Sequence, residues 1–102
     1  MSADTKIIED VQEKVKIEEP SMYKVMLHND DFTTFNFVIS VLTEIFHKTV
    51  DDAIAITESI HFQGRGIAGA PYTKEIAEEK VYETMRYAQA NGFPLLASVD
   101  SM

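Results

Sequence analysis

The sequence contains no cysteine and no tryptophan. Without cysteine there is no disulfide bond, no thiol nucleophile and no thiolate zinc site, which argues against a secreted disulfide scaffold. No apolar run approaches the roughly 18 residues that a membrane-spanning helix needs. The segment Met1–Lys6 also lacks the basic-then-apolar pattern of a signal peptide. These absences predict a soluble, cytoplasmic protein with no membrane partner.

Positive charge is scarce as well. Nine Lys and Arg residues stand against 17 Asp and Glu, for a net charge of −8. Nucleic-acid binding needs clustered cations that displace the counterions of phosphate groups. The six cations after residue 20 are scattered along the chain: Lys24, Lys48, Arg65, Lys74, Lys80 and Arg86. We therefore expect no nucleic-acid partner, and a cationic partner fits the charge better.

The chain divides into a tail and one domain. In residues 1–20, apolar residues are interleaved with six acids and three lysines, and Pro20 closes the stretch. The spacing of these apolar residues would suit a short amphipathic helix, but such a helix is marginally stable unless a partner buries its apolar stripe. We therefore predict a flexible extension that contacts a partner. Residues 21–102 read as one globular core, and a 102-residue chain buries roughly two-thirds of its unfolded surface without disulfides.

Apolar periodicity and capping residues predict the elements of the core. Strand patterns cover Met22–His28, residues 65–72 and Leu95–Val99; helices are predicted from Thr33 or Thr34, from Thr49 to about Ile60-His61, and from Thr73 to Asn91. Gly64 and Gly66 are both expected to end the second helix. The order β-α-α-β-α-β predicts an α+β fold. Its three helices pack against one face of a small, mainly antiparallel three-stranded sheet.

The segment Gly64–Gly69 matches the G-x-G-x-x-G pattern of dinucleotide-binding loops. That pattern indicates phosphate binding only after a strand and at the start of a helix. Here it follows a helical segment and leads into Ala70-Pro71, in a chain too short for a dinucleotide domain. A helix stop that feeds a strand is the preferred interpretation.

Two interpretations compete for the chain's carboxylates and histidines. His28, Asp30, Asp31 and His61 carry groups that suit zinc or iron, but their spacing matches no ligand motif. No Ser or Thr sits in a nucleophile motif. The residues therefore do not predict an enzyme or a cofactor, and a metal-dependent hydrolase built on these four side chains stands as an alternative.

The second interpretation concerns the segment Asn29-Asp30-Asp31, which by itself is typical of a turn before a helix. If His61 lies beside it, the amide, carboxylate and imidazole groups form a cluster of hydrogen-bond acceptors. Such a cluster next to apolar residues suits a primary ammonium on a hydrophobic group. A protein N-terminus, with a pKa of about 7.7–8.0, is such a group.

The same residues resemble a known family. The run Pro20–Thr33 closely resembles the start of the ClpS adaptor core. The segments Phe37–Leu42, Ile60–Gly64, Tyr72–Lys80 and Pro94–Leu96 resemble its later blocks. The resemblance covers about residues 20–99, in order and without large gaps. Several blocks in order are far more specific than any one of them.

The resemblance implies a non-catalytic adaptor without a cofactor. Such adaptors bind N-degron substrates, which begin with Leu, Phe, Tyr or Trp, and deliver them to a Clp AAA+ unfoldase and its peptidase. It assigns the substrate α-amino group to Asn29, Asp30, Asp31 and His61. It assigns the hydrophobic pocket to Leu27, Thr33, Phe35, Val38, Thr57, Ile60 and Leu95. It assigns docking on the unfoldase N-terminal domain to Glu75, Glu78 and Lys80. It also implies that the tail before Pro20 engages the unfoldase during substrate handover.

The chain departs from the family pattern at three places. Phe35 stands where the family usually has a pocket methionine, and Thr57 stands where another is common, so the choice of N-terminal residue is expected to differ. Near Ala70-Pro71 the chain is one residue longer than the usual family spacing, which predicts a bulge in that strand.

A third hypothesis for the function is a module that docks on the unfoldase without binding N-degrons.

Overall fold

The computed structural model describes residues 21–102, so the predictions for residues 1–20 lie outside the described residues. The elements follow one another as β1 (Tyr23–His28), α2 (Phe35–Glu44), α3 (Val50–Gln63), β2 (Arg65–Tyr72), α4 (Lys74–Ala90) and β3 (Leu96–Ser101). The predicted order β-α-α-β-α-β is confirmed. Within residues 21–102, no helix combines the length and apolarity that crossing a membrane requires.

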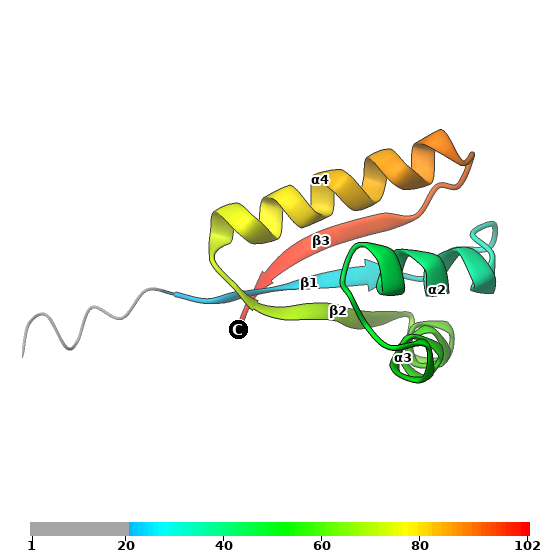
Figure 1. Ribbon diagram of the computed structural model, residues 1–102, viewed down its shortest axis with the longest axis horizontal. Helices are drawn as coiled ribbons and strands as arrows, with labels where there is room; N and C mark the ends of the chain where they lie inside the picture. The colour runs from blue at the N-terminus through cyan, green and yellow to red at the C-terminus, as the bar shows by residue number, and fades with distance from the viewer. Residues whose placement is uncertain (1–20) are drawn as a thin grey trace, which may run out of the picture.

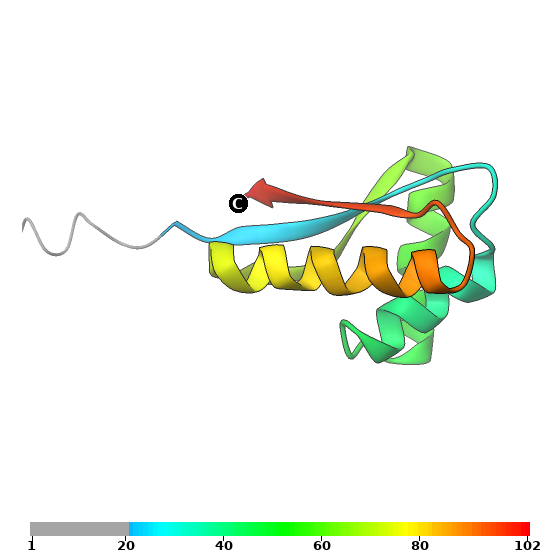
Figure 2. The same ribbon diagram turned by 90° about the horizontal axis from the view of Figure 1, so that it is seen from above.

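The three strands form a sheet in the order β2-β1-β3, and both pairings are antiparallel. Helices α2 and α4 lie on the same face of this sheet, and α3 lies beside β2 (Figures 1 and 2). The pairing of β1 with β2 shifts register between Tyr23 and Met26. Tyr23 pairs with Tyr72, and Val25 pairs with Gly69, which leaves an extra residue on β2. The bulge expected near Ala70-Pro71 is therefore present.

Each described helix begins after a threonine. The side-chain oxygens of Thr34, Thr49 and Thr73 accept hydrogen bonds from backbone N–H groups three residues later. Of the two threonines predicted to cap α2, Thr34 is the cap. Gly64 ends α3 with a φ of 89°, in the left-handed region that glycine adopts without steric cost. The expectation for Gly66 is wrong, because this residue lies inside β2 and takes no part in the cap.

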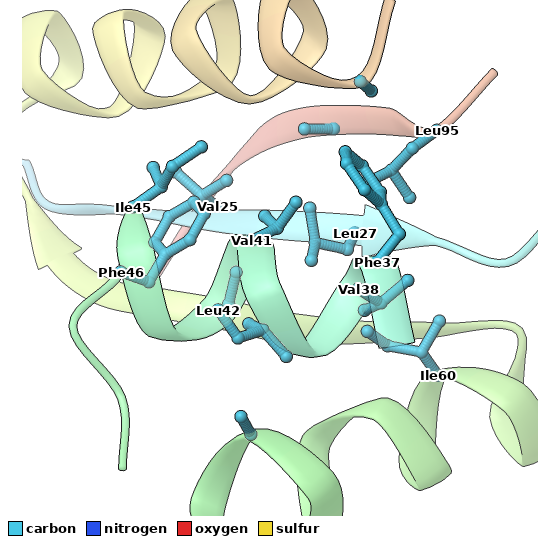
Figure 3. Packing of buried hydrophobic residues seen from close by; sticks show 14 of the residues in the cluster. Val25, Leu27, Phe37, Val38, Val41, Leu42, Ile45, Phe46, Ile60 and Leu95 are labelled. Atoms are coloured by element: carbon cyan, nitrogen blue, oxygen red, sulfur yellow. The ribbon is translucent and has the colours of Figure 1, made fainter. Parts of the chain in front are cut away.

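The core lies between the sheet and its helices (Figure 3). Val25 and Leu27 of β1 are fully buried against the apolar stripe of α2, which includes Val41 and Leu42. Helix α4 contributes small residues such as Ala77 and Ala88, both fully buried. The apolar residues of α2 thus hold this helix against the sheet, and its first turn is fixed beside the loop that follows β1.

Candidate functional site

A cavity of about 340 Å³ opens where the loop after β1, the first turn of α2 and the end of α3 meet. Its lining residues all belong to the set that the sequence singled out: Asn29, Asp30, Asp31, Thr33, Phe35, Val38, Thr57, Ile60 and His61. They come from segments far apart in the chain, so the cavity exists only in the folded protein.

A backbone hydrogen bond brings the loop and the helix together. The N–H of Asn29 donates to the carbonyl oxygen of Gly64 at 2.8 Å. Gly64 is the residue that ends α3, and His61 lies in the last turn of that helix. This bond therefore holds Asn29 and His61 on the rim of the same cavity, the juxtaposition on which the acceptor-cluster interpretation depends.

Asp30 organises the loop. Its Oδ1 accepts hydrogen bonds from the N–H groups of Phe32 at 2.8 Å and Thr33 at 2.6 Å, and its Oδ2 accepts one from the Thr33 hydroxyl at 2.6 Å. Partial burial of the carboxyl acts to raise its pKa. The three hydrogen bonds outweigh this effect, and the pKa of Asp30 lies below its ordinary value of 3.8. Asp30 is thus an anion whose oxygens hold the loop in shape.

This lowered pKa predicts an acid-dependent loss of stability. Folding favours the ionised form of Asp30, so its contribution is full above its unfolded pKa of 3.8 and disappears as the pH falls through the lower folded value. We expect the Asp30→Asn variant to lose less stability than the wild type between pH 6 and pH 3. Urea unfolding at the two pH values measures this. Identical losses in the two proteins would contradict it.

The other polar side chains on the rim of the cavity are available to accept hydrogen bonds from a ligand. Within residues 21–102, the side chains of Asn29, Asp31 and His61 are exposed and make no hydrogen bond to another described residue. The amide oxygen of Asn29 and the carboxylate of Asp31 accept hydrogen bonds, and the imidazole of His61 does so when it is neutral. The rim therefore presents an amide oxygen, a carboxylate and an imidazole nitrogen to whatever enters the cavity.

The inner wall of the cavity is apolar. Val38 and Ile60 are 6% and 3% exposed. Thr57 is buried too, and its hydroxyl donates to the carbonyl oxygen of Ala53 at 2.7 Å, so this donor is used inside α3. Phe35 is 42% exposed and completes the lining. An acceptor-rich rim over such a wall suits a ligand with a cationic donor group attached to a hydrophobic one.

Two residues predicted for the pocket do not line this cavity. Leu27 and Leu95 belong to the buried core and are not among the cavity's lining residues. Their assignment to the pocket stays a prediction, with the lining residue Val38 packed in the same core cluster.

Of the four residues of the metal alternative, Asp30, Asp31 and His61 line the same cavity and His28 does not. The Nε2 of His28 lies 2.6 Å from the Ser98 hydroxyl oxygen on β3. In the part of the chain that the structure describes, no three His, Cys, Asp or Glu side chains are grouped closely enough to hold a metal ion. The geometry therefore gives the hydrolase alternative no ligand set.

The residues predicted for docking lie on α4. Glu75 and Glu78 are exposed near its start, at the end of the molecule opposite the loop between β1 and α2 (Figure 1). Lys80 is partly buried, and its Nζ donates to the carbonyl oxygen of Ile45, the C-terminal cap of α2, at 2.9 Å. This capping role was missed at the sequence level, because no local pattern links residues in two separate helices.

Comparisons with known proteins agree on one family. The family model described as ATP-dependent Clp protease adaptor protein ClpS matches residues 18–98. A relative named ATP-dependent Clp protease adapter protein ClpS, from Clostridium acetobutylicum, is 47% identical, and the match covers 93% of each chain. One of the same name from Myxococcus xanthus is 43% identical over 95% of this chain and 90% of its own.

A solved structure is similar as well. It is that of Agrobacterium tumefaciens ClpS2 bound to L-phenylalaninamide, with a TM-score of 0.78 and 32% sequence identity. The match covers 82% of this chain and 100% of that one. The likeness therefore extends over the whole of the solved chain.

Proposed function

The chain belongs to the ClpS family of ATP-dependent Clp protease adaptor proteins, and from this premise we propose that its cavity binds the first residue of substrate proteins. Like the relatives it matches, it is an adaptor of the Clp protease and not an enzyme. Under the proposal, the cavity recognises N-degrons, whose first residue is Leu, Phe, Tyr or Trp, through a free α-amino group. The adaptor then hands the substrate to a Clp AAA+ unfoldase.

One observation carries the proposal: free acceptors and a buried apolar wall share a single cavity. A protein α-amino group has a pKa of about 7.7–8.0, so at neutral pH most of it is an ammonium with three N–H donors. Asn29, Asp31 and His61 supply acceptors for those donors. An internal peptide bond has one donor and leaves acceptors unpaired, which disfavours its binding.

The size of the cavity fits one large side chain. Its volume of about 340 Å³ is at the lower end of the roughly 300–1,000 Å³ usual for small-molecule sites. L-phenylalaninamide, the ligand of the similar Agrobacterium protein, has a free α-amino group and a benzyl side chain. Its chemistry matches the acceptor rim and the apolar wall, and this supports the proposal. Binding of peptides with free and acetylated N-termini tests it.

Delivery requires a second surface, which we place at the start of α4. The exposed carboxylates of Glu75 and Glu78 lie at the opposite end of the fold from the loop that carries Asn29. One adaptor can therefore hold a substrate while α4 contacts the N-terminal domain of the unfoldase. Lys80 is the third residue of this proposed surface, and the hydrogen bond of its ammonium to Ile45 also gives it a structural role.

We expect the double substitution Glu75→Ala with Glu78→Ala to weaken binding of the unfoldase N-terminal domain about tenfold, since it removes two exposed charges from the contact. Binding of a Phe-initiated peptide should not change. Titration calorimetry with the isolated unfoldase domain measures the first effect. Glu58→Ala, an exposed glutamate of α3, is the matched control. Lys80→Ala is a poorer probe because it also uncaps α2. Unchanged domain binding in the double variant would contradict this docking surface.

A further inference from the structure

The glycines of the segment Gly64–Gly69 have separate tasks in the fold. Gly64 ends α3, and its N–H donates to the carbonyl oxygen of Ile60 at 2.9 Å. Gly66 lies in β2, where it pairs with Leu27 of β1. Its φ is not in the left-handed region, so the backbone does not demand glycine there. The reason for a glycine at this position is the space around it.

The absence of a side chain at Gly66 leaves room for the side chain of Ile60. A Cβ atom at this position would lie 2.8 Å from Cγ1 of Ile60 and 3.7 Å from its Cδ1. Non-bonded carbons pack at about 3.5–4.0 Å, so the two side chains cannot share this space unless Ile60 or the backbone moves. Ile60 is thus seated directly against the backbone of β2.

The same side chain forms a wall of the cavity. Ile60 is 3% exposed and lines the cavity together with Val38 and Thr57. Figure 3 shows it directed from α3 toward Val38 of α2. Gly66 lies behind this wall and is not itself a lining residue. A displacement of Ile60 away from β2 is therefore a displacement into the cavity.

We propose that Gly66 is a specificity-determining residue: by carrying no side chain, it lets Ile60 retract against β2 and leaves the cavity deep enough for aromatic N-terminal side chains. The inference rests on the proposed function, because it assigns the cavity to that side chain. It places a determinant of residue preference in the strand behind the pocket, where no contact with the ligand occurs.

The test compares peptides that begin with Leu, Phe or Trp. In Gly66→Ala, Ile60 moves into the cavity, and binding of the Phe and Trp peptides should weaken roughly tenfold relative to the Leu peptide, the usual effect of about one methylene group in a pocket. Ile60→Val in the Gly66→Ala background removes one methyl group and should restore the aromatic-to-leucine affinity ratio. Fluorescence anisotropy measures all of these affinities.

Gly69→Ala is the matched control in the same strand. A Cβ there would meet the Tyr72 ring and, at 3.0 Å, Cδ1 of Phe46, and neither side chain lines the cavity. This variant should change all three affinities by the same factor. An unchanged affinity ratio in Gly66→Ala, or an equal change of the ratio in Gly69→Ala, would overturn the inference.

A second readout does not depend on peptide binding. The ¹³C-methyl resonance of Ile60 should shift in Gly66→Ala and stay in place in Gly69→Ala; no shift in Gly66→Ala would also overturn the inference. If the wild type binds none of the peptides, the proposed function fails and the role of Gly66 in specificity fails with it. If the wild type binds them and the affinity ratio does not respond to Gly66→Ala, only the present inference fails.

Discussion

Acetylation of the α-amino group should weaken binding of a Phe-initiated peptide by roughly 100-fold or more. A hydrogen bond to a charged group contributes about 1.5–3 kcal/mol, and acetylation removes the charge and two of the three donors. The acceptors of Asn29, Asp31 and His61 then lose partners in a site from which the ligand has displaced water. Fluorescence anisotropy of a labelled peptide, free and acetylated, measures the effect at pH 7.

Two controls separate this effect from a general preference for hydrophobic peptides. A peptide with the same composition and an internal Phe should bind as weakly as the acetylated one, since it offers the benzyl group without an adjacent ammonium. Amidation of the distant C-terminus should have no effect. Equal affinity of the free and acetylated peptides would refute recognition of the α-amino group.

The second large effect is expected from His61→Ala. Loss of one acceptor for a charged donor should weaken binding of the free-amine peptide about 10- to 100-fold. His61→Gln, which keeps an acceptor, should recover part of the affinity. His47→Ala is the matched control, because His47 is an exposed histidine in the loop between α2 and α3 and does not line the cavity. Peptide anisotropy and urea unfolding together distinguish lost binding from lost stability.

The His61 variant also separates the proposed adaptor from a module that only docks on the unfoldase. In the proposed mechanism, His61→Ala lowers peptide affinity and leaves binding of the unfoldase domain intact, since α4 begins at the opposite end of the fold (Figure 1). Unchanged binding of both ligands would instead favour the docking-only hypothesis. The double substitution at Glu75 and Glu78 should do the opposite: it weakens binding of the unfoldase domain and leaves peptide affinity unchanged.

Local chemistry explains why the elements were predictable. Thr34, Thr49 and Thr73 cap helices because their side-chain oxygens accept from N–H groups within the same turn. Gly64 ends α3 because a left-handed residue is needed there. Such signals involve residues a few positions apart, so they are legible in the sequence. The helix end assigned to Gly66 was wrong because this residue belongs to β2 and pairs with Leu27 of β1, a partner far away in the sequence.

The sequence predicted which residues line the candidate site, but it did not predict how the fold brings them together. The order of the motif blocks indicated the ClpS family, and the family pattern pointed to the residues that line the cavity. The departures at Phe35 and Thr57 were also visible in the sequence. What the sequence by itself determined was therefore the family, the secondary structure and the chemical character of the cavity's lining.

Only the tertiary structure decided how these parts meet. It placed Asn29 beside Gly64, assigned Leu27 to the core, engaged Lys80 with the end of α2 and seated Ile60 against Gly66. Each of these contacts joins residues from different elements. Their distances depend on how the helices pack on the sheet, and apolar periodicity specifies which face of an element is buried without specifying which residue it meets.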